Sequence, residues 1–198
     1  MDKLHAGNRL PSFVSRQVTE ARRFFLNLNP DRRSRLEVVC GGVERMRPDY
    51  VVQRTDFPYF AVELVAEGRG TLVISGQQHA LSPGVAFAYG PGAEHTIRND
   101  ADLPMRKYYL DFVGTGAKGL LRDAGLIGER DSFQPISIGA LHELTELYEL
   151  LIGNAGDEGP LANPICESLA NLMMLKLRHR RLSEGAVLPQ SYATYETI

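Results

Sequence analysis

The sequence of 198 residues has no tryptophan, only two cysteines, no surplus of charge and no long apolar run. Cys40 and Cys166 stand far apart and outside any C-x-x-C pair, which argues against a disulfide scaffold or a zinc knuckle. With 22 basic and 24 acidic residues, the chain has no overall field that attracts phosphate backbones or anionic membranes. No apolar stretch approaches the roughly 20 residues that span a bilayer. We therefore expect a cytoplasmic protein.

The length allows one core of ordinary size, or a barrel with a helical appendage. Residues 15–28 carry apolar side chains at helical spacing, which predicts a short amphipathic helix. The middle of the chain instead alternates short β-type runs with Gly and Pro turns, which is typical of an antiparallel sandwich or jelly roll. The predicted strands are residues 36–40, 50–54, 60–67, 70–75, 84–89, 95–98 and 107–113.

The last third of the chain is helical in pattern. Leucines recur at three and four residues from Leu141 to Ile152, and Gly153 is a predicted stop. A second helix is predicted to open at Asn163-Pro164, a capping residue followed by a proline that suits the first helical position. The basic residues 178–181 at its end suit the helix dipole, with a nucleic-acid contact as the alternative.

The region from residue 57 to residue 99 resembles the double motif of the cupin barrel. Cupins are usually recognised by H-x-H-x3-E-x6-G followed by G-x5-P-x-G-x2-H-x3-N. Glu63 keeps the spacing of the first motif, and His95 that of the second. Phe57 and Tyr59 stand where the two metal-binding histidines of the first motif would be. The resemblance thus implies a cupin barrel that holds no metal and no cofactor and binds a small molecule.

The same region, extended through the helices, resembles the ligand-binding domain of AraC/XylS-type bacterial transcription regulators. The pieces that carry this resemblance are E-L-V-x-E-G-x-G, L-x-P-G-x-x-F and P-G-x-x-H. It implies an arm with a short helix at residues 1–35, a cupin ligand-binding barrel at 36–136, dimerising helices at 137–183, and a linker at 184–198. DNA binding would belong to a helix-turn-helix domain that this chain lacks. The resemblance also implies a homodimer, although the leucine-rich helices could simply cover the barrel.

Seven residues are candidates for effector binding. Tyr59 and Glu63 share one face of a predicted strand, and Lys107 and Tyr109 share one face of another. A carboxylate at Glu63 can accept hydrogen bonds from vicinal hydroxyls of a monosaccharide, or it can pair with Arg54. Since tryptophan is absent, a tyrosine would stack on the sugar. The candidates are Arg54, Tyr59, Glu63, Tyr89, His95, Lys107 and Tyr109.

His95 and Tyr108 have alternative interpretations. His95 can hydrogen-bond a sugar, or it can be an interior residue with its needs met by the protein, and with Glu63 alone it makes a poor transition-metal site. Tyr108 can pack beneath the C-terminal helices. The competing class for the whole chain is a cupin enzyme, either a metal-dependent dioxygenase or isomerase or a sugar epimerase that uses His95 and a tyrosine. The sequence favours a sensor that is not an enzyme.

Overall fold

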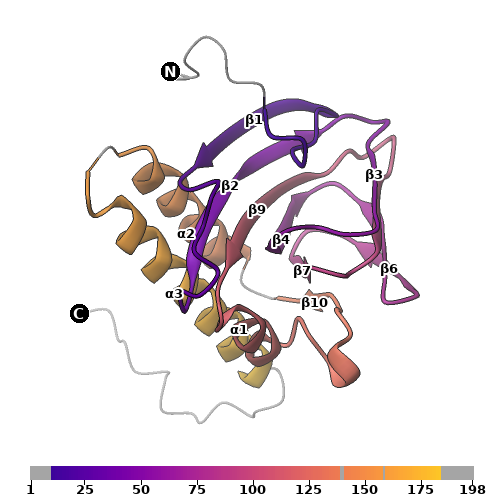
Figure 1. Cartoon of the computed structure of the whole chain (residues 1–198). Helices are drawn as coiled ribbons and strands as arrows, with labels where there is room; N and C mark the ends of the chain where they lie inside the picture. The colour runs from indigo at the N-terminus through magenta and orange to yellow at the C-terminus, as the bar shows by residue number, and fades with distance from the viewer. Residues whose placement is uncertain (1–9, 139–140, 158, 184–198) are drawn as a thin grey trace, which may run out of the picture.

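The computed structural model describes residues 10–138, 141–157 and 159–183, and it is built from two antiparallel sheets that face each other (Figure 1). The larger sheet has the strand order β1-β2-β9-β4-β7-β10, and the smaller has β3-β8-β5-β6. The strands are β1 Val18–Phe25, β2 Glu37–Met46, β3 Val51–Arg54, β4 Phe60–Glu67, β5 Gly70–Ile74, β6 Gln77–Leu81, β7 Val85–Tyr89, β8 His95–Asn99, β9 Arg106–Val113 and β10 Ile136–Ser137.

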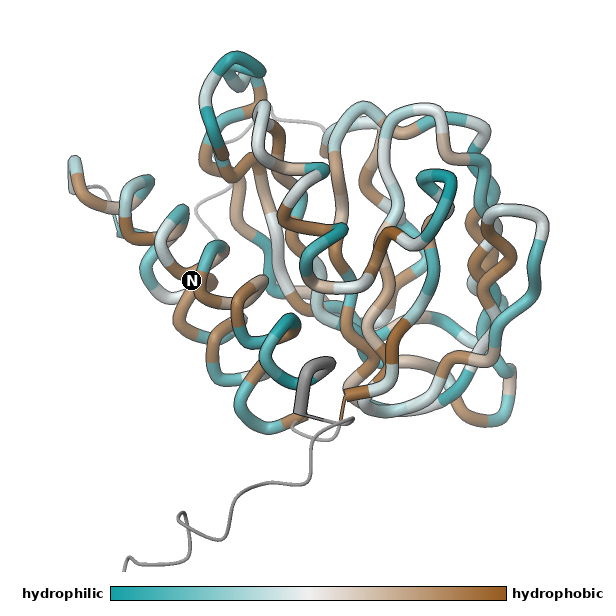
Figure 2. Tube along the Cα trace, turned by 90° about the horizontal axis from the view of Figure 1, so that it is seen from below, coloured by the Kyte–Doolittle hydropathy of each residue, from teal (hydrophilic) through white to brown (hydrophobic). Residues whose placement is uncertain are grey.

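Three helices cover the outer face of the larger sheet. They are α1 Ala117–Ala124, α2 Leu141–Ala155 and α3 Ala162–Ser183, with a short 3-10 turn at Glu129–Asp131. Figure 2 shows α2 and α3 running side by side as a layer next to the strands. The predicted mainly β fold, a cupin-like barrel followed by helices, is therefore confirmed. Among the described residues, no helix is long and apolar enough to cross a membrane.

The hydrophobic core has two parts because the larger sheet is covered on both faces. Tyr108, Leu110 and Phe112 of β9 pack under the helices, whereas Tyr109 faces the space between the sheets. Alternate residues of one strand thus serve different layers. The Tyr108 ring stacks on Tyr148 of α2 with centroids 5.1 Å apart, so the interpretation of Tyr108 as a packing residue is confirmed.

The predicted helix at residues 15–28 is wrong, because this segment contains strand β1 at the edge of the larger sheet. Its phenylalanines fit a strand equally well, since Phe24 packs toward the helices and Phe25 toward the barrel interior. Pairing with β2 places Arg23 opposite Gly42 and supplies the backbone hydrogen bonds. A Cβ atom on Gly42 would lie 2.2 Å from the carbonyl oxygen of Arg22, so only glycine allows this close approach.

Three smaller differences concern the ends of elements and short elements. Strand β2 continues through Gly41 and Gly42 to Met46, although a Gly-Gly pair is typical of a turn. Helix α2 continues past Gly153 to Ala155. The sequence prediction missed β6, β10 and α1, whereas the other strands agree with it to within a residue or two. The predicted linker at 184–198 lies outside the described residues, as does most of the N-terminal arm.

Candidate functional site

A small cavity lies in the barrel interior, between the two sheets. It is lined from β2, β3, β4, β7 and β9, and from the segment 13–15 that precedes β1. The space available to the centre of a water molecule is about 30 Å³, which suffices for one or two water molecules and not for a sugar. The walls are polar for an interior, with Glu44, Glu63 and Asp111 among the buried side chains.

Glu63 and Lys107 form a buried ion pair at the centre of this cavity. Lys107 Nζ contacts Glu63 Oε2, and the two side chains are 4% and 3% exposed. Tyr89 donates its hydroxyl to Glu63 Oε1 at 2.6 Å. Although burial opposes the charge of Lys107, the Glu63 carboxylate and the Tyr50 ring beside it hold the pKa of Lys107 above its usual value. Both charges therefore persist at neutral pH.

Asp111 accepts a hydrogen bond from the thiol of Cys40 at 3.2 Å. Burial raises the pKa of Asp111 to about 7, even though the thiol contact lowers it. Burial also raises the pKa of the Cys40 thiol, so this cysteine stays protonated and unreactive. Tyr109 lies nearby with a buried hydroxyl that has no hydrogen-bond partner among the described residues. These two side chains hold unused hydrogen-bonding capacity inside the barrel.

The segment 13–15 closes the mouth of the cavity. Arg54 donates from Nη2 to the carbonyl oxygen of Phe13, and its guanidinium lies 4.7 Å from the centre of the Phe57 ring. The Phe13 ring packs edge-on against Phe57 and Tyr59, with centroid distances of 6.0 and 5.3 Å. Tyr59 thus stands at the mouth rather than in the cavity wall. The expected ion pair between Arg54 and Glu63 does not form, because Lys107 takes that place.

His95 is buried on the far side of Tyr89 from the cavity. Its ring stacks on Tyr89 with centroids 4.0 Å apart, and Nδ1 lies 3.0 Å from the carbonyl oxygen of Ala93. Nε2 has no partner among the described residues, and burial lowers the pKa of the imidazole. His95 lines a separate open groove outside the barrel, so the structure does not bring it together with Glu63 around one hollow.

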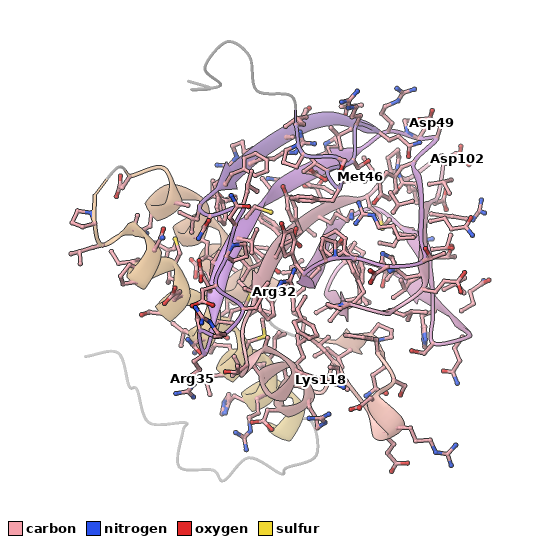
Figure 3. All side chains as sticks on the ribbon, in the orientation of Figure 1. Arg32, Arg35, Met46, Asp49, Asp102 and Lys118 are labelled. Atoms are coloured by element: carbon pink, nitrogen blue, oxygen red, sulfur yellow. The ribbon has the colours of Figure 1, made fainter. Side chains whose placement is uncertain are left out.

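The outer groove is larger than the interior cavity, at about 530 Å³. It lies between the loop 90–94, the end of β5 and the segment near Phe133. Its charged wall is an ion pair of 2.9 Å between Asp131 and Lys118, the latter at the start of α1 in Figure 3. Both side chains are about half exposed, so their interaction is weak. The groove brings no buried charges together, and the interior cavity is the better candidate site.

The structure thus brings five of the seven candidate residues to one cavity. Arg54, Glu63, Tyr89, Lys107 and Tyr109 line it, while Tyr59 stands at its mouth and His95 behind Tyr89. Sequence reasoning missed the roles of Glu44, Tyr50, Asp111 and the segment 13–15. Tyr50 lies at even spacing from Arg54, and Asp111 from Tyr109, so alternation would have found both. Glu44 and the segment 13–15 were hidden by the wrong assignments on β1 and β2.

The residues at the cupin metal positions suit a cation poorly. Phe57 and Tyr59 replace two ligands, and the Glu63 carboxylate already holds the ammonium of Lys107. A metal ion at Glu63 would meet this fixed positive charge. Among the residues that the structure describes, no group of three or more His, Cys, Asp or Glu side chains is placed to hold a metal ion.

Comparison with solved structures gives cupin barrels of low sequence identity. YhaK from Escherichia coli is 15% identical, with 62% of this chain and 53% of that chain covered and a TM-score of 0.45. A cupin domain of an XRE family transcriptional regulator from Enterobacter cloacae is 17% identical, covering 46% and 95%, with a TM-score of 0.34. A predicted oxalate decarboxylase from Thermotoga maritima is 13% identical, covering 39% and 68%, with a TM-score of 0.36. These scores support no statement about function.

Comparison with curated proteins finds no match. The family model of the AraC-like ligand binding domain matches residues 40–170, which is more than half of the chain. The matched region runs from β2 through the barrel and α2 into α3, so it includes the cavity and the helices that cover the larger sheet. The chain therefore belongs to the family of AraC-like ligand binding domains.

Proposed function

We propose that this chain is the effector-sensing, dimerising domain of an AraC-type transcription regulator, and that its effector is a sugar or a similar polyol. The observation that carries the proposal is the polar cavity inside the barrel. Tyr109 and Asp111 keep hydrogen-bonding capacity there that the described residues do not use, and hydroxyl groups of a ligand can both donate and accept. DNA contact would belong to a separate domain, in the cytoplasm.

The mechanism follows from the size of the cavity. About 30 Å³ is too small for a monosaccharide, so the segment 13–15 has to move before an effector enters. The segment is held by a hydrogen bond from Arg54 and by the rings of Phe57 and Tyr59. An effector would shift the equilibrium between closed and open arrangements by its difference in affinity for the two. The position of the segment is then the signal passed to the rest of the protein.

The competing function is that of a cupin enzyme with a metal centre or with His95 as a base. We favour the sensor because Glu63 is committed to Lys107 and because His95 is separated from the cavity by Tyr89. Elemental analysis of the purified protein separates the two classes. Stoichiometric iron, manganese or zinc would favour the enzyme.

We expect Tyr109→Phe to weaken effector binding without destabilising the free protein. The Tyr109 hydroxyl is buried and has no partner among the described residues, so its removal breaks no contact within the protein. The measurement is a thermal-shift screen of sugars and polyols, in which a ligand at 100 times its Kd adds about 2.7 kcal/mol to stability. A compound that stabilises wild type should stabilise the variant markedly less. Equal stabilisation of both proteins would place the ligand outside the barrel.

Helix α3 presents an apolar stripe on its exposed side. The stripe consists of Leu161, just before the helix, and of Ile165, Leu172 and Leu175, whose exposed fractions are 65%, 38%, 39% and 54%. The spacings of four, seven and three residues are those of a coiled-coil seam. Since the buried side of α3 already covers the barrel, this second apolar side suits a copy of the same helix in a homodimer.

We expect a dimer of the 22.0 kDa chain in sedimentation experiments, and a monomer when Leu172 and Leu175 are both replaced by glutamate. Charges in the stripe would have to be buried unpaired at the interface. Leu103→Glu is the matched control, since Leu103 is 47% exposed next to Asp102, which lies across the molecule from α3 in Figure 3. A wild-type monomer at high concentration would refute the dimer.

A further inference from the structure

The cavity contains one cation that no carboxylate neutralises among the described residues. Glu63 is paired with Lys107, and Glu44 is paired with Arg23 at 2.6 Å. Arg54 also lines the cavity, but its contacts are the Phe13 carbonyl oxygen and the Phe57 ring. The remaining cavity group that can carry a negative charge is Asp111.

Asp111 compensates Arg54 only in part. It shares no ion pair with Arg54, and it is bonded instead to the Cys40 thiol. Burial raises the pKa of Asp111 to about 7, so part of the protein carries a protonated Asp111 at neutral pH. In those molecules the cavity has a net positive charge at Arg54. Such an environment favours an anionic guest.

Backbone carbonyl groups of the segment 13–15 occupy the donors that such a guest would use. Arg54 donates to the carbonyl oxygen of Phe13, and Arg23 donates to that of Ser15 at 3.1 Å. A carbonyl oxygen is a neutral acceptor that takes one of the several N–H groups of a guanidinium. A carboxylate offers two charged oxygens in a geometry that matches the guanidinium fork. The protein's own backbone thus occupies a position better suited to a carboxylate.

We propose that the effector is a polyhydroxylated carboxylate, the class of the uronic and aldonic acids, and that its carboxylate replaces the Phe13 carbonyl on Arg54. The hydroxyl groups would then bond to Tyr109 and Asp111. This inference rests on the proposed function, because it specifies the ligand of the same cavity. It also accounts for the opening of the mouth, since the group that binds Arg54 is the one that releases Phe13.

A neutral sugar satisfies this site less well. Once Phe13 leaves, Arg54 is a charged group in a poorly solvated mouth with only hydroxyl groups as acceptors. An α-amino acid brings a carboxylate too, but it lacks the hydroxyl groups that Tyr109 and Asp111 would bond. The chemical class is therefore set by a negative charge at one end of the molecule and hydroxyl groups at the other.

The test compares compounds that differ only at the acidic carbon. D-galacturonate is matched with D-galactose, and D-glucuronate and D-gluconate with D-glucose, with glycine and L-alanine as amino acid probes. Calorimetric titration of the full chain should give affinity for at least one acid that is about tenfold or more above that for its neutral partner. Arg54→Gln should lose this preference, and Arg54→Lys should keep part of it because the charge remains.

Three results would overturn the inference. These are equal affinity for an acid and its neutral partner, an acid preference that survives in Arg54→Gln, or no binding of any acid in the panel. If neutral sugars bind wild type and lose affinity in Tyr109→Phe, the proposed function stands while the acidic class is wrong. If no compound binds and the protein contains a stoichiometric metal, both proposals fail. Circular dichroism of each variant shows whether it is folded, and Arg54→Lys remains informative if Arg54→Gln is not.

Discussion

Replacing Lys107 by methionine is expected to lower the free energy of unfolding by about 3 to 5 kcal/mol. The ammonium of Lys107 and the carboxylate of Glu63 are both almost fully excluded from solvent. Removing the ammonium leaves Glu63 with the Tyr89 hydroxyl as its remaining partner among the described residues. The carboxylate must then either stay charged without compensation or take up a proton. Urea unfolding at pH 7 measures the loss.

The matched control for this variant carries Glu63→Gln in addition to Lys107→Met. A glutamine retains an acceptor for the Tyr89 hydroxyl and has no charge to compensate. The double variant should therefore recover most of the lost stability, because replacing both members of a buried pair is much less costly than removing one. If the single variant loses less than about 1 kcal/mol, the two charges are not buried as a pair in the protein.

Asp111→Asn is expected to remove a pH dependence of stability that wild type shows. Burial raises the pKa of Asp111 from 3.8 to about 7 in the folded state. A raised pKa means that the folded protein binds the proton more tightly than the unfolded chain, so this group stabilises at low pH. Its contribution is lost as the pH rises from about 4 through 7. Between pH 5 and pH 8 the loss is about 2 to 3 kcal/mol in wild type and absent in the variant.

The environment of Asp111 defines the control for this experiment. Cys40 and Glu44 face it from β2, Glu63 from β4 and Arg54 from β3. All of these remain in the variant, so the difference between the two unfolding curves isolates Asp111.

His95 contributes in the opposite direction and has to be separated from Asp111. Burial lowers the pKa of its imidazole, so its contribution is present above pH 6.5 and is lost as the pH falls through its folded value. Denaturant unfolding at several pH values, with wild type and Asp111→Asn side by side, cancels the His95 effect. Parallel curves for the two proteins would contradict a raised pKa at Asp111.

The barrel strands were predictable because their side-chain pattern and turn residues agree. Strand β4 matches its prediction to the residue, since alternating apolar positions end at the turn made by Gly68. Gly68 has a positive φ of 77°, which is the backbone conformation that glycine adopts most readily. Local rules and tertiary structure coincide there, so the sequence alone was sufficient.

The two errors at the N-terminal side have a common cause in the neighbouring strand. Phe24 and Phe25 satisfy both a helical and a β pattern, and only the exposed edge of β2 decides between them. That edge was not visible in the sequence, because Gly41-Gly42 looks like a turn when its partner strand is unknown. A glycine that permits close backbone approach and a glycine that breaks a strand are identical locally.

The candidate site was predicted in position but not in its connections. Alternation along β4 and β9 correctly placed Glu63, Lys107 and Tyr109 on faces that meet. Which cation would pair with Glu63 depends on the register between strands. The structure aligns Glu63 with Tyr109 and leaves Lys107 within reach of the carboxylate, while Arg54 is held at the mouth by Phe13. Side-chain partners across sheets follow from register, which residue patterns within one strand do not specify.

The most direct test of the cavity as the effector site is calorimetric titration of wild type and Tyr109→Phe with the compound that gives the largest thermal shift. We expect one ligand per chain for wild type and much weaker binding for the variant, whose free form keeps its stability. Equal affinity in the two proteins, or a stoichiometric metal ion in the purified chain, would contradict an effector site inside the barrel.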